Sequence, residues 1–278
     1  MVIWNAALLE KSIVLSVTNT FSPTATVKGN VILSGTGKLY GSAGTGAFTN
    51  GIAAWVFEGD VSITNANSGL SNDGTSGTNI YRFQKAGTQT LNSIGTIAAT
   101  DSTKPVTAEI ASGTTLNMGT SQISGAQTIT KVDSNATLIS AHSNGLSGNL
   151  DGGINNLNAN ANYVFNGSGA QITGTCLPAI VNNLTINNAS GVTLSSNITI
   201  NGTLTLINGK LALVSKNIVA ASVSGGSQSS YVVTDSSGAL TLNNVTGSNV
   251  CFPVGTLSSY NPVIINNTGA ADNFSVRV

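Results

Sequence analysis

The chain has 278 residues, of which 40% are hydrophobic and only 7% are charged, and its ten basic and ten acidic side chains give no net charge. This balance excludes intrinsic disorder, which goes with low apolar content and high net charge. No basic stripe is interleaved with aromatic residues, so we expect no nucleic-acid partner, and the length suits one elongated domain, with or without a small appendage.

Residues 1–20 form an apolar N-terminal segment. It opens with MVIWNAALL and contains SIVLSV (12–17), a run that predicts a strand, whereas residues 6–11 show a trace of helical periodicity. No basic residue precedes the apolar start, which is not typical of a signal peptide, so we expect a removed leader or a fragment. A solenoid end without a polar cap exposes strand groups that can pair, and residues 1–20 are therefore expected to serve assembly.

Residues 21–228 alternate short apolar runs with turn residues. Strands are predicted at residues 25–33 and 61–64, and the Gly-rich segment GSAGTGAFTNG (41–51) is expected to form a long corner that protrudes. The spacing becomes more regular in TAEIASGTTLNMGTSQISGAQTITKV (107–132). Helix formers are scarce throughout, so we predict an all-β fold.

The repeat is clearest in residues 182–213, which read NNLTINNASGVTLSSNITINGTLTLINGKLAL. Apolar residues stand there in pairs two positions apart, which places each pair on one face of an extended strand. Asn, Ser and Gly residues between the pairs form tight turns. The pairs recur 19 or 20 residues later: Leu184/Ile186 as Leu204/Leu206, Val192/Leu194 as Leu211/Leu213, and Ile198/Ile200 as Ile218/Ala220.

Each short strand therefore matches the third strand after it. This pattern predicts a parallel β-helix, that is, a β-solenoid with about 20 residues and three short strands per coil, whose coils stack roughly 4.8 Å apart. A hairpin-based sandwich is the alternative, but it does not predict the three-strand match. In the solenoid, four threonines point outward: Thr185, Thr193, Thr199 and Thr205.

The spacing of the apolar residues changes near residues 225–227. Longer segments of alternating pattern follow, which predict strands: YVVTD, ALTLNNV, NPVIINN and FSVRV. Pro253 and Pro262 interrupt this part of the chain. We expect a hairpin-style cap or a partial β-sandwich there. The predicted organisation is thus an N-terminal strand and assembly segment (1–20), a β-solenoid (21–228) and a C-terminal β-strand region (229–278).

Three phrases in residues 136–278 stand out: YVFNGSGAQITGTCLP, NNLTINNASGVTLSS and FPVGTLSSYNPV. With these phrases, that half of the chain resembles repeat regions in large surface and secreted proteins of Bacteroidetes. Such proteins commonly carry a sorting domain for type IX secretion and serve adhesion or gliding. The resemblance implies an extracellular or cell-surface location. It implies no binding or catalytic residue, because these repeats are scaffolding in that family as well.

The acidic residues are too scattered to predict a polysaccharide-cleaving site, which needs clustered carboxylates. Glu58 and Asp60 share a face, and a solvated corner is the simpler interpretation. Glu109, Asp133 and Asp151 stand isolated in the sequence. We therefore predict no catalytic residue, no metal ligand, no cofactor and no enzymatic activity.

Three other residues could carry chemistry. His142, the single histidine, is expected in a corner, since no carboxylate or cysteine stands near it in the sequence. Cys176 and Cys251 lack the spacing of a metal motif, and they either form one disulfide or remain two buried small apolar residues. No apolar run reaches the roughly 18 residues that a transmembrane helix needs, so we expect no membrane span.

These observations favour an extracellular structural or adhesive protein, a β-solenoid subunit of a bacterial surface adhesin or filament. We expect it to form a homopolymer by strand addition through residues 1–20 and 263–278, and we name surface glycans as a further class of partner. The alternative is a carbohydrate-binding or polysaccharide-cleaving β-helix. Its aromatic platform would have to come from Trp4, Tyr40, Trp55, Tyr81 and Phe83.

Overall fold

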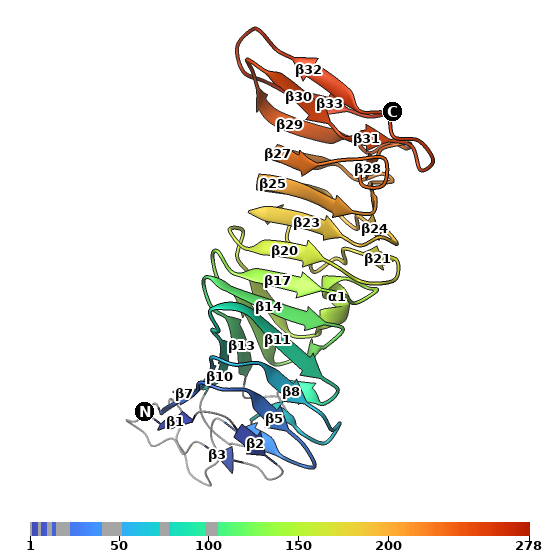
Figure 1. Ribbon diagram of the computed structural model, residues 1–278. Coiled ribbons are helices and arrows are strands. Elements are labelled where there is room, and N and C mark those ends of the chain that lie inside the picture. Colours follow the sequence, from blue (N-terminus) through green and yellow to red (C-terminus); the bar gives the residue numbers. More distant parts are fainter. Residues whose placement is uncertain are drawn as a thin grey trace. The chain divides into compact units, whose positions relative to one another are not determined.

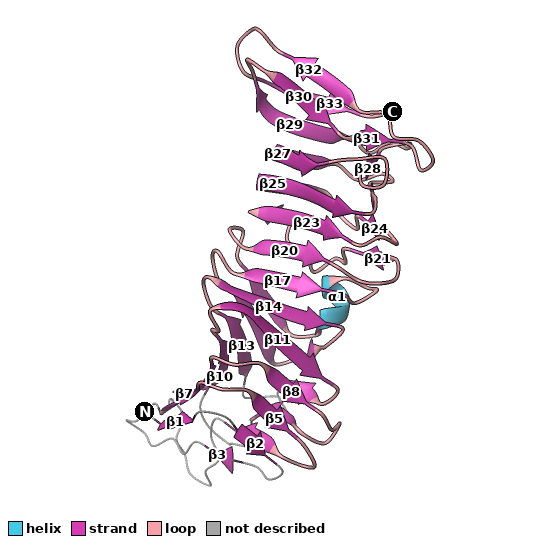
Figure 2. Cartoon of the chain, in the orientation of Figure 1, coloured by secondary structure: helices cyan, strands magenta, loops and turns pink. Residues whose placement is uncertain are grey.

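The computed structural model describes residues 2–4, 7–9, 13–14, 23–40, 52–72, 78–97 and 105–278. Strands dominate these residues, and a single short helix, α1 (Leu146–Asn149), interrupts them (Figure 2). The predicted all-β fold is confirmed. The long corner expected at residues 41–51 lies outside the described residues.

The chain divides into two compact units, which are considered one at a time. Unit 1 consists of Met1–Leu138 and Asn149–Asn158, and unit 2 consists of Ile139–Gly148 and Ala159–Val278. The strand β17 (Thr137–Ser140) contributes residues to both units.

Unit 1 contains three sheets in which each strand pairs in parallel with the third strand after it (Figure 1). The first sheet contains β1 (Val2–Trp4), β4 (Thr24–Val27), β7 (Ile52–Phe57), β10 (Thr78–Phe83), β13 (Val106–Ile110), β16 (Thr128–Val132) and β19 (Ile154–Leu157). The second contains β2 (Ala7–Leu9), β5 (Val31–Leu33), β8 (Val61–Ile63), β11 (Gly87–Ser93) and β14 (Thr114–Gly119). The third contains β3 (Ile13–Val14), β6 (Lys38–Tyr40), β9 (Gly69–Ser71) and β12 (Thr96–Ile97), and β15 (Ile123–Ser124) pairs separately with β18 (Leu150–Asp151).

Unit 2 contains two larger sheets and one separate strand pair, whose members lie side by side in Figure 1. The first sheet contains β20 (Asn162–Phe165), β23 (Asn183–Asn187), β25 (Ile198–Asn208), β27 (Ile218–Gly225), β29 (Leu240–Val245) and β33 (Asp272–Val276), with β22 (Ile180–Val181) also on β25. The second contains β21 (Gln171–Ile172), β24 (Val192–Thr193), β26 (Leu211–Ala212), β28 (Val232–Val233) and β31 (Val254–Gly255). The pair consists of β30 (Asn249–Phe252) and β32 (Val263–Asn266).

The register predicted from the repeat is confirmed in unit 2. Leu204 lies beside Leu184, Leu211 beside Val192, and Ile218 beside Ile198, all on parallel strands. These apolar side chains are buried, whereas the alternate threonines between them are only half-buried. Sequence neighbours do not pair with each other here, so the sandwich alternative is wrong for this region, and the pairing is compatible with a β-helix.

Two details of the predicted repeat are wrong. First, β25 is one continuous strand of 11 residues, because Asn201 and Gly202 form a register irregularity between Ile200 and Thr203 and not a corner. Second, the coil of about 20 residues fits unit 2 only. In unit 1 Ala25 lies beside Trp55, a step of 30 residues, because residues 41–51 separate the end of β6 from the start of β7.

The ends of the chain continue the same pairing. The strands β1 and β2 pair in parallel with β4 and β5, so residues 7–9 are extended and not helical. Of the predicted strand at 12–17, the structure describes residues 13 and 14, which belong to β3. Parallel pairing also passes the predicted boundary at 228/229, since β28 pairs with β31; antiparallel pairs follow, as a hairpin-style end predicts.

Buried amide side chains satisfy backbone groups at the corners. Gln89 Nε2 donates to the carbonyl oxygens of Phe57 (3.2 Å) and Gly59 (2.5 Å). Gln171 Nε2 donates in the same way to the carbonyl oxygens of Ser140 (3.2 Å) and His142 (2.9 Å). Buried carbonyl groups need such partners, so these amides link successive turns of the chain without using charge.

Replacing Gly209 with alanine is expected to lower the free energy of unfolding of unit 2 by about 2–4 kcal/mol. Gly209 has a φ of +76°, and a Cβ there would overlap the carbonyl oxygen of Asn188. Gly247 has a φ of +69° with open space where a Cβ would lie, which makes Gly247→Ala a matched control for strain alone, at about 1 kcal/mol. Urea denaturation of both variants measures the difference, and equal losses would refute the steric role of Gly209.

Candidate functional site

A ladder of charged side chains crosses the first sheet of unit 1. Arg82 on β10, Glu109 on β13 and Lys131 on β16 occupy registered positions. The Arg82 Nε–Glu109 Oε2 and Lys131 Nζ–Glu109 Oε1 distances are both 2.6 Å, and Lys131 Nζ is also 2.9 Å from Asp133 Oδ1. The prediction that Glu109 and Asp133 are isolated is wrong, because strand pairing joins residues 27 and 22 positions apart.

The surroundings of Glu109 favour its ionised form. Its side chain is only 7% exposed. Burial alone would raise the pKa of Glu109, but hydrogen bonds from Lys131 and Arg82 outweigh that effect and lower the pKa. The hydrogen bonds with Glu109 and Asp133 likewise raise the pKa of Lys131. Two cations and two carboxylates cancel, so the ladder stabilises strand order and presents no net charge to a ligand.

Replacing Glu109 with glutamine is expected to cost roughly 1–3 kcal/mol at pH 7, because two charge-assisted hydrogen bonds are lost. The pKa of Glu109 is lowered in the native state. Its carboxylate therefore contributes stability that is complete above the ordinary glutamate pKa and is lost as the pH falls through the lower native pKa. Urea denaturation measures the free energy of unfolding at pH 7 and at pH 3. The drop between the two pH values should be smaller for Glu109→Gln than for the unchanged chain. Glu58→Gln serves as the control, and an unchanged pH dependence in Glu109→Gln would contradict this account.

The other predicted polar positions lie in corners or at strand ends. Glu58 and Asp60 lie between β7 and β8, as the sequence predicts, and Asp60 Oδ1 is 2.8 Å from Lys85 Nζ. His142 lies in the turn before α1, where its Nδ1 accepts a hydrogen bond from the Asn144 amide at 3.1 Å. Asp151 is an exposed residue at the end of β18. Among the described residues, no group of three His, Cys, Asp or Glu side chains is placed to hold a metal ion.

The aromatic platform that the carbohydrate alternative requires does not form among the described side chains, which pack in the core or lie half-buried. Trp55, Tyr81 and Phe83 are fully buried, and the rings of Phe57 and Tyr81 stack with their centroids 6.4 Å apart. Tyr40 is half-buried, and the side chain of Trp4 lies outside the described residues. These aromatic residues face inward because they occupy alternate positions on β7 and β10 with the other core side chains.

No disulfide joins the two cysteines. Cys176 is half-buried and Cys251 is exposed. The prediction of either a disulfide or two buried apolar residues is therefore wrong. Cys251 lies on β30 opposite Ile264 of β32, a side chain that is itself 64% exposed, so this strand pair leaves the thiol at the surface.

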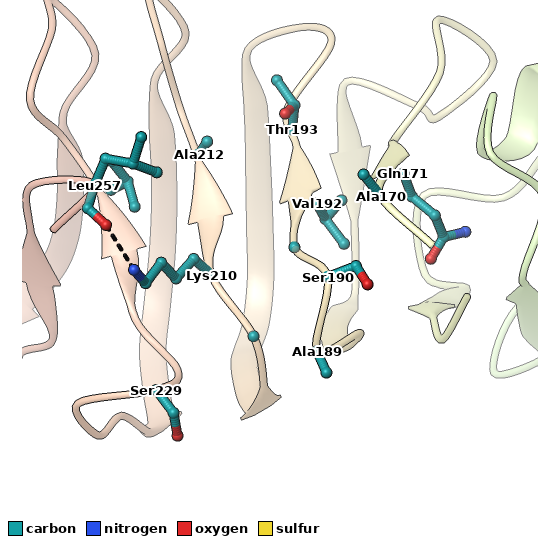
Figure 3. Close-up of a pocket in the computed structure, with 13 residues that line it drawn as sticks. Ala170, Gln171, Ala189, Ser190, Val192, Thr193, Lys210, Ala212, Ser229 and Leu257 are labelled. Atoms are coloured by element: carbon teal, nitrogen blue, oxygen red, sulfur yellow. Dashed lines mark hydrogen bonds between the residues drawn. The ribbon is translucent and has the colours of Figure 1, made fainter. Parts of the chain in front are cut away.

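A hollow in unit 2 lies over the second sheet and is called the Lys210 hollow (Figure 3). Its volume is about 360 Å³. Thr193, Ala212 and Val233 occupy registered positions on β24, β26 and β28 and line it. Its remaining apolar and hydroxyl lining includes Ala170, Ala189, Ser190, Val192, Ser229 and Leu257.

The ammonium group of Lys210 is fixed at this hollow. Lys210 Nζ donates a hydrogen bond to the carbonyl oxygen of Leu257 at 2.6 Å, as Figure 3 shows, and it lies 5.1 Å from the centroid of the Tyr231 ring. The Tyr231 hydroxyl donates to the carbonyl oxygen of Thr256 at 2.7 Å, and its ring packs on Tyr260. Among the residues that the structure describes, no carboxylate forms an ion pair with Lys210.

Sequence reasoning missed both the ladder and the hollow. The signal for the ladder lies in the register, since strands 22 to 27 residues apart place opposite charges side by side. The hollow depends on three registered strands and on the segment around Leu257, which is 47 residues from Lys210. No short motif marks such a site.

Comparisons with other proteins leave the family open. The chain matches no protein-family model, no curated protein and no solved structure. Within the described residues, no helix has the length and apolar character needed to cross a bilayer. The resemblance of residues 136–278 to Bacteroidetes repeat regions therefore stays a prediction.

Proposed function

We propose that the chain is an extracellular structural or adhesive protein, a β-solenoid subunit of a bacterial surface adhesin or filament. The observation that carries this proposal is the parallel register of strands over buried apolar columns in both units. Stacked coils of this kind form a stiff element whose backbone hydrogen bonds run along the stacking direction. In unit 2, Val192, Leu211 and Val232 each donate to the next coil at 2.9 Å.

The closed, three-sided coil is part of this proposal. In unit 1 the chain visits the three sheets in turn, from β4 through β5 and β6 to β7, and then repeats the sequence. In unit 2 the long strands β25 and β27 would each form two sides of a coil, with the irregularity after Ile200 as the bend between them.

Outer polar side chains support an exposed, uncharged surface. Asn162 Oδ1 accepts hydrogen bonds from the Nδ2 atoms of Asn182 (2.9 Å) and Asn183 (2.8 Å). The hydroxyls of Thr203 and Ser222 lie 2.9 Å apart on neighbouring strands. Such ladders satisfy polar groups from coil to coil without charge, which suits a surface protein held in an assembly.

Self-association through terminal strands is the proposed route to a homopolymer. Among the described strands, β33 pairs only with β29, and an edge of this kind can accept a further strand. Among the described strands of unit 1, β1, β2 and β3 likewise each pair with one strand only, β4, β5 and β6. Residues 263–278 of one copy and residues 1–20 of the next are the proposed contact.

Negative-stain electron microscopy tests this function. The whole chain is expected to form long uniform fibres, and a variant without residues 1–17 is expected to form short particles only. A variant without residues 263–278 should behave in the same way, while circular dichroism confirms that the remaining strands are folded. Fibres of unchanged length from both deletions would reject the terminal contact, and separate particles from the whole chain would reject the filament.

Carbohydrate binding is the second candidate function. The buried aromatic residues give it no support, but the Lys210 hollow does, because it combines an apolar lining with hydroxyl groups and a fixed cation.

A further inference from the structure

We propose that the Lys210 hollow binds a carboxylated sugar unit, of the kind that acidic glycans carry. The proposal deepens the adhesive role, on which it rests, by assigning a site and a ligand class to it. The site consists of Lys210, the hydroxyl-bearing Ser190, Thr193 and Ser229, and the apolar Ala212 and Val233.

The charge of the hollow selects an anion. Lys210 provides the cation, and no carboxylate of the described residues pairs with it. By contrast, Lys85 and Lys131 each form an ion pair. An ammonium group has three N–H donors, and the Leu257 carbonyl oxygen accepts from one of them. Donors therefore remain for a ligand. The contacts with Leu257 and Tyr231 also hold the group in place, which reduces the entropy lost on binding.

A single cation favours a singly charged ligand. A carboxylate carries one negative charge, which one lysine can balance, whereas a phosphate group carries more and is commonly bound by arginine or by several donors. Among the residues lining the hollow, Lys210 is the one with a charge. The charge count therefore points to a carboxylate.

The remaining lining favours a sugar ring over an acyl chain. Ser190 Oγ donates to the Ser168 carbonyl oxygen at 2.8 Å, so its lone pairs stay open to accept from a ligand hydroxyl. Thr193 and Ser229 add two more hydroxyls, while the half-buried Ala212 offers aliphatic surface to the apolar face of a ring. The volume of about 360 Å³ lies near the lower end of the range for small-molecule sites, which suits a terminal sugar and not a long chain.

Titration with two matched oligosaccharides tests the site, one ending in glucuronic acid and the other in glucose. The whole chain is expected to bind the acidic sugar at least about tenfold more tightly, because only its carboxylate can form a charge-assisted hydrogen bond with Lys210 Nζ. Raising the salt concentration should weaken that binding. Lys210→Met keeps the aliphatic stem and should remove the preference. Lys216→Met, a lysine outside the hollow, should keep it.

A second variant guards against an indirect effect, because Lys210→Met also loses the bond to Leu257. Ala212→Phe keeps Lys210 but fills the hollow, so it should abolish binding, and urea denaturation checks that the variant is folded. Equal affinity for both sugars, no binding of either, or retained binding in Ala212→Phe would overturn the site. Electron microscopy of the unchanged chain and of Lys210→Met separates the two proposals. Fibres from both chains, with sugar binding lost in Lys210→Met, support both proposals. Separate particles from the unchanged chain, with its preference for the acidic sugar retained, count against the filament and not the site.

Discussion

Replacing Leu204 with alanine is expected to lower the free energy of unfolding of unit 2 by about 2–5 kcal/mol. Leu204 is fully buried and lies between Leu184 of β23 and Val223 of β27 in the same register. Truncation removes apolar contacts to both neighbouring strands and leaves a cavity that parallel strands cannot close without losing their hydrogen bonds. Amide hydrogen exchange of β23, β25 and β27, with urea denaturation, measures the loss.

The neighbouring residue provides the control. Thr205 lies on the same strand but is half-buried on the other face, so Thr205→Ala is expected to cost under about 1 kcal/mol. Because β25 pairs with β23 and β27, the exchange should also rise most in those two strands and less in strands farther away. Similar losses for both variants would contradict the inward and outward alternation.

Replacing Trp55 with alanine is expected to cost unit 1 about 3–5 kcal/mol. The Trp55 side chain is fully buried between the registered strands β4 and β10, and its Nε1 donates to the carbonyl oxygen of Tyr40 at 3.1 Å. Its removal leaves a large cavity and deprives the Tyr40 carbonyl of a donor. Urea denaturation followed by circular dichroism measures the effect, and Trp55→Phe, which keeps a ring, should lose less.

This experiment also separates a core role from a carbohydrate platform. A buried core residue loses stability on truncation and leaves sugar binding by the folded chain unchanged. An aromatic residue in a binding groove does the reverse, because its ring is exposed and adds little to the core. Loss of sugar binding in Trp55→Ala without a change in the unfolding transition would therefore reject the packing described for unit 1.

The sequence predicts the strands and their register well where corners are short. In residues 182–213 the pairs Leu184/Ile186 and Leu204/Leu206 are placed opposite each other as expected, because period-two burial leaves only one register that keeps both pairs inside. In unit 1 the steps between paired strands vary, as from Ala25 to Trp55. A fixed repeat length therefore cannot find that register.

The candidate sites could not be predicted in the same way. The ion pair of Glu109 and Lys131 and the contact of Lys210 with Leu257 join residues 22 and 47 positions apart. Each depends on which strands are neighbours and on where the connecting segments fold back. At Asn201-Gly202 the sequence predicts a corner where the structure has a strand irregularity, because Asn-Gly is compatible with both.

Disulfide trapping between outward positions tests the parallel stacking most directly. In a chain with Cys176→Ser and Cys251→Ser, cysteines introduced by Thr185→Cys and Thr205→Cys lie at paired positions on β23 and β25, at the usual strand separation of about 4.8 Å, which suits a disulfide. The stacking predicts rapid cross-linking of this pair and none of Thr185→Cys with Thr193→Cys. Rapid cross-linking of the second pair without the first would mean that sequence neighbours pair instead, and the stacked arrangement would be wrong.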